Sequence, residues 1–438
     1  MDIYTLTVVL FFSMFILLAL GLPVGFTLGG VGLVFTLILW GPKALMTIAF
    51  AAQDNWAATL LMAAPLFLLM GSILEISGIA DDIYEMFYKL MGGIRGGLGI
   101  GTIIICTIFA AIMGISGAST LTMGTIALPS MFKRGYDKHM VIGCVAAGGV
   151  LGILIPPSVI MILYAMVARE SVGQLYAGGI VPGLLLATLY CLYMGIRCYF
   201  QPEMGPAIPL AERASFKEKL VSLKAVIIPL ILIFLALGTI YAGICTPTEA
   251  AAVGALGGFI SAAIKRRLTL EVVKKSLLQT FTITGMVMWI LLGATLFSNL
   301  YRAMGAQDIV MGFVTDRLGI GPWGVIIMMQ LSLFILGCLM DDYAIVLLCA
   351  PIYVPIIKAL GFDTLWFAIL FMVNMQMAYL TPPYGFNLFY MKSIVPPGIT
   401  MGDIYKSIVP YVALQMTGLI LCMVFPQLCV WLPRVLLK

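Results

Sequence analysis

Residues 152–166, GILIPPSVIMILYAM, are apolar enough to lie inside a lipid bilayer, yet two adjacent prolines stand among them. Proline has no backbone N–H and its ring clashes with the preceding turn, so Pro156 and Pro157 must interrupt any helix here. In hydrocarbon, a backbone carbonyl without a hydrogen-bond partner costs several kcal/mol. The break is therefore tolerated only where something satisfies the freed carbonyl groups.

The composition identifies a membrane protein that crosses the bilayer many times. Of 438 residues, 62% are hydrophobic and only 10% are charged, and the mean hydropathy is +1.12. A soluble domain is nearer half apolar and a quarter charged. Apolar runs of about 20 residues, the length of a membrane-spanning helix, recur throughout. The nine cysteines form no CxxC pair, so the sequence predicts neither a disulfide framework nor a cysteine metal site.

We predict an all-α fold with ten membrane crossings and two shorter hairpins. The crossings are residues 3–20, 23–40, 59–76, 140–168, 178–196, 225–241, 248–264, 276–300, 364–391 and 407–432. Residues 98–132 and 322–357 have turn-prone polar centres, GISGAST at 114–120 and CLMDDYA at 338–344. Each arm of about 15–18 residues is short for the roughly 30 Å of hydrocarbon. These stretches are therefore predicted to be re-entrant hairpins with tips near the bilayer midplane.

The positive charges agree with a topology in which the N-terminus is outside. If each hairpin returns to its own side, residues 79–97, 132–139, 197–224, 265–275 and 392–406 lie inside. These segments carry 17 of the 24 lysines and arginines. Such a bias toward the cytoplasmic side is the positive-inside rule. We therefore expect a multi-pass protein of the inner, cytoplasmic membrane, embedded in the lipid bilayer, with a periplasmic N-terminus.

The two halves of the chain repeat with a shift of 226 residues. Pro129 then matches Pro355, Asp137 matches Asp363, and the proline pair at 156–157 matches the pair at 382–383. We predict a first repeat at 1–200, a cytoplasmic linker at 201–224 and a second repeat at 225–438. Each repeat holds five crossings and one hairpin. Because five is odd, the second repeat is expected to be inserted upside down.

Inverted repeats with interrupted helices are the means by which secondary transporters build a binding site at the midplane. The freed carbonyl groups then become cation ligands. The first predicted site sets Ser116, Gly117, Ser119 and Thr120 against residues 152–158, including Gly152 and Pro156. The second site sets Asp341 and Asp342 against Asn374, Thr381, Pro382, Pro383, Gly385 and Asn387. Oxygen ligands suit a hard cation such as Na⁺ and no transition metal. The substrate is expected near Ser116, Ser158 and Asp342.

Two interpretations stay open for several of these residues. Ser116, Ser119 and Thr120 are equally suited to close helix packing or to capping the returning arm. Asp341 and Asp342 are also suited to capping the outgoing arm, where the helix dipole favours a carboxylate. A carboxylate near the bilayer centre costs roughly 2.5–3.5 kcal/mol on insertion scales, so function is the default interpretation for at least one of them.

An enzyme and a channel are the alternatives to a transporter. The GISG motif at 114–117 matches the Gly-x-Ser-Gly pattern of rhomboid intramembrane serine proteases. A serine nucleophile needs a histidine base, and the sole histidine, His139, lies in the predicted cytoplasmic loop. HExxH and the Walker GxxxxGK[ST] motif are both absent. No catalytic residue is therefore predicted. A channel needs no inverted repeat, whereas alternating access explains one.

Several long motifs resemble a known family. They are GISGAS, TMGTIALPSM, KRGYDKHM, AAGGVLGILIPPSVIMILY, AGGIVPGLLLA, GICTPTEAAAVGA and NMQMAYLTPPYGFNLF. Together these motifs resemble the large membrane subunit, the DctM-like protein, of tripartite ATP-independent periplasmic (TRAP) transporters over essentially the whole chain.

The resemblance implies an elevator-type, sodium-coupled importer of organic acids in a bacterial inner membrane. It implies two protein partners, a small four-helix membrane subunit and a periplasmic substrate-binding protein. No cofactor beyond the coupling ion Na⁺ and no nucleic-acid partner is expected. The residues that match the family's hairpin tips and breaks are Ser116, Gly117, Ser119, Gly152, Pro156, Pro157, Asp341, Asn374, Thr381, Pro382, Pro383 and Asn387.

Overall fold

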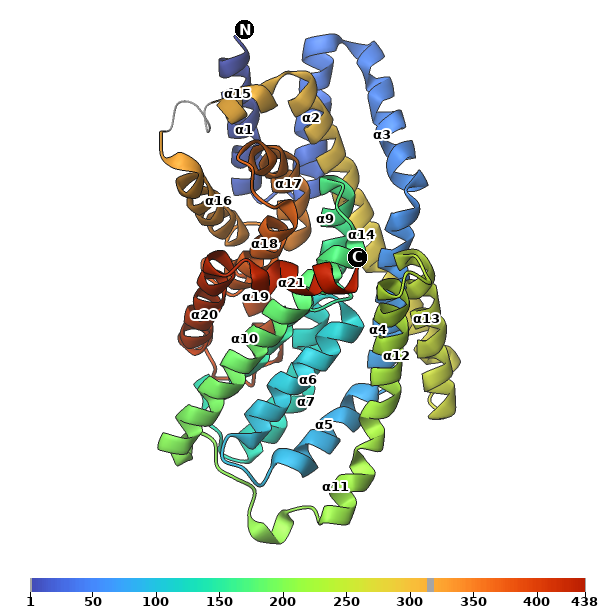
Figure 1. Cartoon of the computed structure of the whole chain (residues 1–438), viewed down its shortest axis with the longest axis vertical. Helices are drawn as coiled ribbons and strands as arrows, with labels where there is room; N and C mark the ends of the chain where they lie inside the picture. Colours follow the sequence, from blue (N-terminus) through green and yellow to red (C-terminus); the bar gives the residue numbers. More distant parts are fainter. Residues whose placement is uncertain (1, 313–318, 438) are drawn as a thin grey trace.

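The computed structural model describes residues 2–312 and 319–437, and these ranges contain helices and no strand. The chain begins at one end of the molecule, at the top of Figure 1. The helices of the first half are α1 (Ile3–Ala19), α2 (Val24–Trp40), α3 (Met46–Ala57), α4 (Ala63–Ile76), α5 (Ile79–Met91), α6 (Gly97–Met113), α7 (Ser116–Lys133), α8 (Lys138–Gly149), α9 (Val159–Ala168) and α10 (Val172–Phe200).

The middle and second half of the described chain are also helical. The helices are α11 (Phe216–Ser222), α12 (Lys224–Tyr241), α13 (Pro247–Ile264), α14 (Leu270–Ala303), α15 (Ala306–Gly312), α16 (Gly321–Gly337), α17 (Asp342–Ala359), α18 (Thr364–Tyr379), α19 (Phe386–Ile394), α20 (Met401–Val424) and α21 (Gln427–Leu436). Seven helical segments of the described part are long and apolar enough to cross a membrane. These properties are consistent with a multi-pass membrane protein.

The repeated sequence positions have the same local structure in both halves. Asp137 caps α8 by accepting from two backbone N–H groups, and Asp363 caps α18 in the same way. Gly135 and Gly361 precede these caps with φ of 75° and 76°, a left-handed conformation that glycine adopts without a steric cost. Both proline pairs interrupt their helices, between α8 and α9 and between α18 and α19. Residues that match under the shift of 226 therefore share backbone conformation as well as amino-acid identity.

The halves differ where α3 and α4 correspond to the single helix α14. Ala58 leaves the helical conformation with ψ of 101°, and a short 3₁₀ turn leads into α4. Pro65 lies in the first turn of α4, where its missing N–H costs no intrahelical hydrogen bond; in a continuous helix its ring would crowd the carbonyl of Leu61. The matching residue of the second half is Leu291, which lies inside the unbroken helix α14. The predicted crossings do not include α3.

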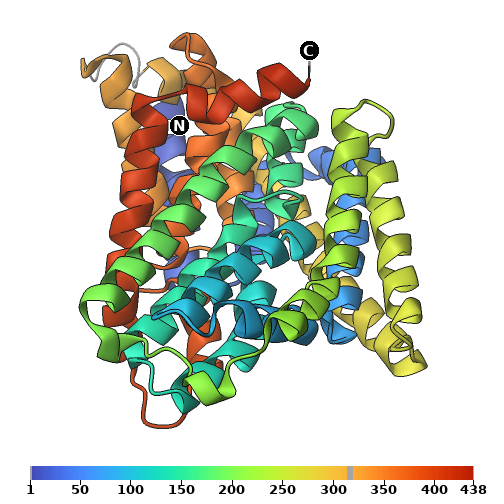
Figure 2. The ribbon, with the colours of Figure 1, turned by 60° about the horizontal axis from the view of Figure 1, so that its bottom comes forward.

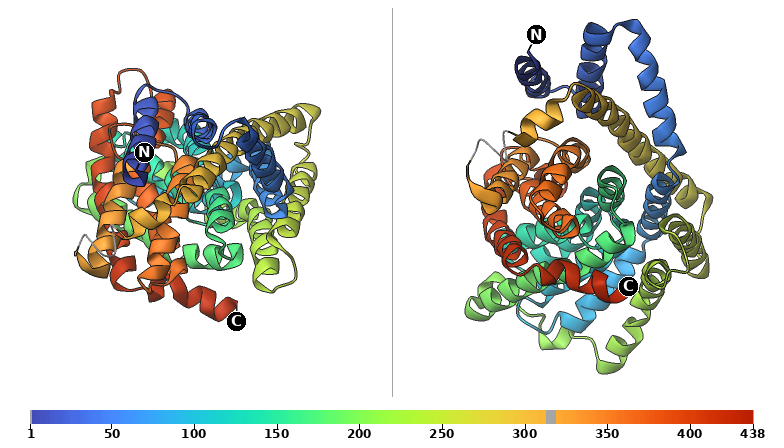
Figure 3. Two further views of the ribbon diagram at one scale, coloured as in Figure 1. Left: turned by 90° about the horizontal axis from the view of Figure 1, so that it is seen from above. Right: turned by 45° about the horizontal axis from the view of Figure 1, so that its top comes forward.

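The helices form two bodies, which Figure 3 shows as a curved outer layer around a denser group. The outer arc comprises α1–α4 and α12–α14, in which α14 packs on α2 and α4, and α13 packs on α4. The inner body comprises α6–α10 and α16–α21, in which α8 packs on α6, α7 and α20. The two bodies meet where α14 lies against α17 and α4 lies against α6.

The two stretches predicted as hairpins are helix pairs, α6–α7 and α16–α17, and both belong to the inner body. Figure 1 shows α6–α7 in the lower part of the molecule and α16–α17 in the upper part. One predicted crossing is wrong in its extent. Residues 407–432 are not one helix, because α20 ends at Val424 and α21 begins after Pro426. A proline just past a helix end cannot continue that helix, and α21 instead packs on α10.

The linker at 201–224 contains two short 3₁₀ helices, Pro202–Met204 and Leu210–Glu212, and the helix α11. Its last part forms α11, which begins with a capping box in which Ser215 and Glu218 bond each other's backbone N–H. Figure 2 brings this linker forward, and it lies beside α5. Helix α5 is itself tied to the end of α13, because Asp82 accepts from Lys265 and Arg267. Burial opposes ionisation of Asp82, but these two hydrogen bonds outweigh it and lower its pKa.

Candidate functional site

The first hairpin tip touches the first proline break. Helix α6 ends at Gly114, which has φ of 65°, and the carbonyl of Gly114 accepts from the backbone N–H of Val159 at 3.3 Å. A Cβ on Gly114 would lie 2.4 Å from the carbonyl oxygen of Pro157. A Cβ on Gly152 would lie 3.2 Å from the carbonyl of Ile115. The tip and the break therefore approach so closely that glycine is required at Gly114.

The hydroxyl groups of the first site are buried at this junction. Ser116, Ser119 and Ser158 are each at most 1% exposed. The Ser158 hydroxyl donates to the carbonyl of Ile153 at 2.8 Å, which satisfies one carbonyl of the broken helix. The Ser119 hydroxyl has no hydrogen-bond partner among the described residues. A buried hydroxyl without a hydrogen-bond partner lowers the stability of the fold unless a ligand hydrogen-bonds to it.

A helix of the second half completes the first tip. Asn387 lies in the first turn of α19, and its side-chain oxygen accepts from the Thr120 hydroxyl at 2.7 Å. Its amide nitrogen donates to the carbonyl of Ala146 at 3.0 Å. One turn later, the ring of Tyr390 covers Gly117, where a Cβ would lie 2.6 Å from a ring carbon. The sequence analysis grouped Asn387 with the second tip, whereas its hydrogen bonds in the described part go to the first half.

The second tip touches the second break in a similar way. The carbonyl of Cys338 accepts from the backbone N–H of Tyr384 at 3.2 Å. The Thr381 hydroxyl donates to the carbonyl of Met377 at 2.7 Å and so satisfies a carbonyl of the interrupted helix α18. Gly385 has φ of 47°, and a Cβ there would lie 2.9 Å from the carbonyl oxygen of Thr381. The segment that carries Pro382 and Pro383 is thus folded tightly back under the tip.

The two aspartates of the second tip differ in surroundings. Asp341 is the N-cap of α17 and accepts from the backbone N–H of Ala344 at 2.7 Å. It also lines a cavity of about 680 Å³, shared with the α1–α2 connection, α14 and Tyr384. Asp342 is the first residue of α17 and is only 1% exposed. A carboxylate buried in a membrane helix is a functional-site hypothesis by default.

Asn374 does not contact the second tip through its hydrogen bonds. Its amide nitrogen donates at 2.7 Å both to the backbone carbonyl and to the side-chain oxygen of Gln330 on α16. Its own side-chain oxygen has no partner among the described residues. Gln376, two residues nearer the break, has neither side-chain atom paired within the described part. Gln330, Gln376 and Tyr390 are not among the predicted site residues, although the two glutamines stand out as amides inside apolar stretches.

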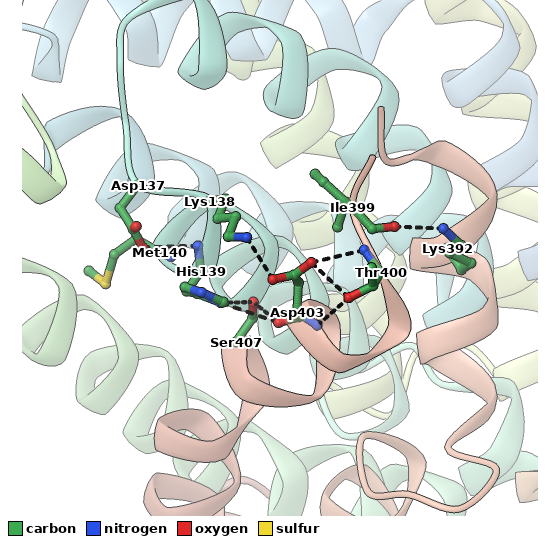
Figure 4. Close-up of polar contacts among 9 residues, drawn as sticks. All are labelled: Asp137, Lys138, His139, Met140, Lys392, Ile399, Thr400, Asp403 and Ser407. Carbon is green, nitrogen blue, oxygen red and sulfur yellow. Dashed lines mark hydrogen bonds and ion pairs between the residues drawn. The ribbon is translucent and has the colours of Figure 1, made fainter. Parts of the chain in front are cut away.

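The sole histidine lies at the far end of α7 from the first tip. In Figure 4, Nδ1 of His139 lies 3.1 Å from the Ser407 hydroxyl and 3.2 Å from the Asp403 carbonyl. Lys138 forms an ion pair with the same Asp403 at 2.6 Å. Helix α7 rises about 1.5 Å per residue over its 18 residues, so Ser116 is roughly 25 Å from that loop. His139 joins α8 to α20 and is not a base for Ser116.

Two polar hairpin tips that face two interrupted helices inside an all-helical membrane body are the architecture of a secondary transporter. The family comparison agrees with this class. The family model described as the DctM component of the tripartite ATP-independent periplasmic transporter matches residues 11–428. The chain therefore belongs to the DctM family, the large permease subunits of TRAP transporters, which are not enzymes. Nothing in the comparisons supports the protease or the channel alternative.

Relatives belong to the same family, and a solved structure shares the fold. The chain is 34% identical over 400 residues to the C4-dicarboxylate TRAP transporter large permease protein DctM of Pseudomonas aeruginosa, covering 91% of this chain and 92% of the relative. It is 30% identical to the isethionate TRAP transporter permease protein DctMQ of Oleidesulfovibrio alaskensis, covering 95% and 64%. The YdaH transporter of Alcanivorax borkumensis shares the fold, with a TM-score of 0.64 at 14% identity and 88% coverage of both chains. TRAP transporters work with a small membrane subunit and a periplasmic binding protein.

Proposed function

We propose that this chain is the permease subunit of a sodium-coupled TRAP importer that moves an organic acid across the bacterial inner membrane. The observation that carries the proposal is the pairing of each hairpin tip with one interrupted helix. Hydroxyl and carbonyl oxygens lie at both pairings, and carboxylates lie at the second. Such oxygen-rich sites suit a hard monovalent or divalent cation. The proposed ligands in the first site are Ser116, Gly117, Ser119, Gly152 and Pro156, together with Asn387, whose hydrogen bonds join this site. The proposed ligands in the second site are Asp341, Thr381, Pro382 and Gly385. The side-chain oxygen of Asn374, which has no partner among the described residues, is proposed as a further cation ligand on α18.

The substrate is proposed to bind between the tips, near Ser116, Ser158 and Asp342. The N-terminus of α7 has no side-chain cap, so its first N–H groups and its dipole favour an anionic group. Interrupted helices in transporters direct their N-termini at substrate carboxylates in this way. The C4-dicarboxylate permease to which the chain is similar carries the name of an organic carboxylate. An organic carboxylate is therefore the proposed substrate class.

The buried carboxyl group of Asp342 suggests why sodium and substrate would bind together. An anionic substrate and an ionised Asp342 would repel each other in the absence of a cation. A cation bound at Asp341 and the second break offsets this repulsion. Sodium binding would then raise the affinity for the organic acid, and by linkage the acid would raise the affinity for sodium to the same degree.

We propose an elevator in which the inner body moves along the outer arc. Both tip-and-break pairs lie in the inner body, so a rigid movement would carry cation and substrate together. The proposed topology has inverted repeats at 1–200 and 225–438, a cytoplasmic linker at 201–224 and a periplasmic N-terminus. Cysteines placed at 133–139 and at 358–363 should then react with impermeant reagents from opposite sides of the membrane. Reaction of both from one side would contradict the inversion.

The proposed partners are a small four-helix membrane subunit and a periplasmic substrate-binding protein. The isethionate relative supports the small membrane subunit as a partner. Its name, DctMQ, is that of a fusion, and this chain spans only 64% of its length. The test is uptake into vesicles that contain the permease with both partners. An inward sodium gradient should drive uptake without ATP, and each cation that enters adds roughly 2.3 kcal/mol per 100 mV of membrane potential. Equal uptake in sodium-free vesicles with a proton gradient would contradict sodium coupling.

A further inference from the structure

A polar cavity of about 430 Å³ lies between α5 and the linker. These two segments lie at the lower end of the molecule in Figure 1. Its walls include Lys89 and the glycines Gly92 and Gly93 on one side, and Arg213 and Lys219 on the other. The volume falls in the roughly 300–1,000 Å³ range of small-ligand sites. Neither hairpin tip contributes to it, so it is separate from the transport site.

The acidic groups of this cavity are already engaged within the chain. Glu212 forms an ion pair with Arg134 at 2.5 Å, and this bond raises the pKa of Arg134. The Glu218 carboxylate accepts from the backbone N–H of Ser215 at 2.7 Å and from its hydroxyl at 2.8 Å. On the α5 wall, Lys89 forms an ion pair with Glu85 at 2.6 Å. Arg213 and Lys219 on the linker are the cavity cations that form no ion pair within the described part.

Two cations of the cavity keep their charge uncompensated. Nε of Arg213 donates to the carbonyl of Ile208 at 2.9 Å, which holds the guanidinium in place along Gly93. In the described part of the chain, no hydrogen bond or ion pair occupies the terminal nitrogens of Arg213 or the amine of Lys219. A fixed guanidinium with free terminal N–H groups matches the oxygens of a phosphate, and a lysine adds a second positive charge.

An apolar stripe beside the cavity locates it at the membrane surface. Phe216, Leu220 and Leu223 lie on one face of α11 and are 81%, 59% and 40% exposed. The stripe continues without a gap into the membrane-spanning helix α12 through Ile227 and Ile231, at intervals of three or four residues. An exposed apolar stripe that continues into a membrane-spanning helix marks a surface suited to contact with lipid. We therefore infer that α11 lies at the lipid boundary, with the cavity at headgroup level.

We propose that this cavity binds the phosphate headgroup of an anionic phospholipid while the α11 stripe contacts its acyl chains. Bound lipid would hold the linker against α5, the helix that connects the outer arc to the first hairpin. The inference does not depend on the proposed substrate or on sodium coupling. It concerns a different ligand and a different face of the molecule.

The test measures lipid retention by native mass spectrometry on the whole purified chain, with phosphatidylglycerol and phosphatidylcholine as probes. The wild-type chain should retain phosphatidylglycerol preferentially. The double variant Arg213→Gln/Lys219→Gln should lose this preference by about tenfold, because each basic residue near an anionic lipid surface contributes measurably to attraction. The matched control is Arg266→Gln/Lys274→Gln, two exposed cations outside the cavity, which should leave the preference unchanged.

A second arm separates a lipid site from a soluble phosphate site. Phe216→Ser should weaken phosphatidylglycerol retention and leave thermal stabilisation by glycerol 3-phosphate unaltered. If the double variant folds poorly, the single variant Lys219→Gln, a change at a surface position, takes its place in the retention measurement and should also weaken the preference for phosphatidylglycerol. Equal retention of both lipids by the wild type, or full preference in the double variant, would overturn the proposal. Stabilisation by glycerol 3-phosphate as strong as by the lipid would also overturn it in favour of a soluble phosphate ligand.

Discussion

The two hairpin tips share a backbone arrangement and differ in charge. With the shift of 226, Ser116 corresponds to Asp342, and each is the first residue of its outgoing helix. The residue before it is Ile115 in the first tip, which leaves α7 uncapped, and Asp341 in the second tip, which caps α17. Each tip meets its break through one backbone hydrogen bond, at 3.3 Å and 3.2 Å.

The two tips are therefore similar in their backbone framework and different in the charge of their side chains. The repeated prolines and one backbone contact per tip build a similar framework twice, although the contacts use different positions: Gly114 bonds Val159, whereas Cys338 bonds Tyr384. The side chains at the tips then differ: the first tip is neutral and has free backbone N–H groups, whereas the second tip is acidic. By charge alone, the first tip suits an anionic group and the second suits a cation. The following changes test this assignment, from the largest expected effect to the smallest.

Ser116→Asp gives the first tip the charge of the second. The added carboxylate would be buried without a partner, a situation that costs roughly 3–5 kcal/mol. Uptake of the organic acid should fall by several hundredfold or more, because the new charge repels the substrate. Ser116→Asn, similar in size and neutral, is the control and should keep at least a tenth of the uptake rate. If both variants fail equally, size and not charge is the cause.

Gly114→Ala should separate the first tip from its break. The left-handed conformation costs a residue with a Cβ about 1–2 kcal/mol, and the clash with the Pro157 carbonyl adds roughly 1–3 kcal/mol. Chemical unfolding should show the sum, together with a loss of transport. Gly135→Ala is matched in φ but has open space around it. Gly135→Ala should therefore lose only the stability that the left-handed conformation costs, and it should keep transport. An equal loss of stability in Gly114→Ala and Gly135→Ala would show that the tip contact is unimportant.

Asp341→Asn tests whether the second tip binds the cation. Asparagine caps a helix as well as aspartate, so the bond to Ala344 and the folding should survive. Loss of one charged ligand should cost about 1–3 kcal/mol. The sodium concentration for half-maximal uptake should therefore rise about five- to hundredfold. Asp363→Asn, an N-cap that is distant from both tips, should leave sodium dependence unchanged; Asp341 is not a ligand if its variant behaves the same way.

Thr120→Val breaks the contact between the second half and the first tip. Asn387 then loses its donor while its oxygen stays buried, which should cost about 1–3 kcal/mol of stability. Thr125→Val is the control, because Thr125 bonds only the carbonyl of Thr122 on its own helix. Substrate affinity should weaken several-fold in the first variant and stay constant in the second. Unchanged affinity and stability in Thr120→Val would mean that this bond does not shape the site.

Ser119→Ala decides between a ligand and a packing residue. Its hydroxyl has no partner among the described residues, so its removal should not lower the stability of the fold. If the hydroxyl is a cation ligand, half-saturating sodium should rise about two- to fivefold in uptake assays, the equivalent of losing one hydrogen-bond-sized interaction. An unchanged sodium dependence would leave close packing as its role. Ser119→Cys, close in size, controls for packing.

The sequence predicted the polar tips and the breaks correctly because each rests on a local rule. A double proline interrupts a helix wherever it stands, and an aspartate before an apolar run caps the helix that follows. The helix pairs at α6–α7 and α16–α17 fall within the predicted stretches for the same reason. The helix α3 was missed, since its break at Ala58 depends on Pro65 and on how α4 packs. The extent of the last predicted crossing was wrong because Pro426 divides it.

Which residues meet across the chain was decided only in three dimensions. Asn387 and Thr120 are 267 positions apart, yet one hydrogen bond joins them. Tyr390 covers Gly117, and Asn374 bonds to Gln330, through packing that no local pattern encodes. Composition, hydropathy and the repeat by themselves determined a membrane transporter with two tips and two breaks, because bilayer length, proline and glycine act within a few residues. The assignment of one residue to one site depends on how helices far apart in sequence pack, and that was settled by the tertiary structure.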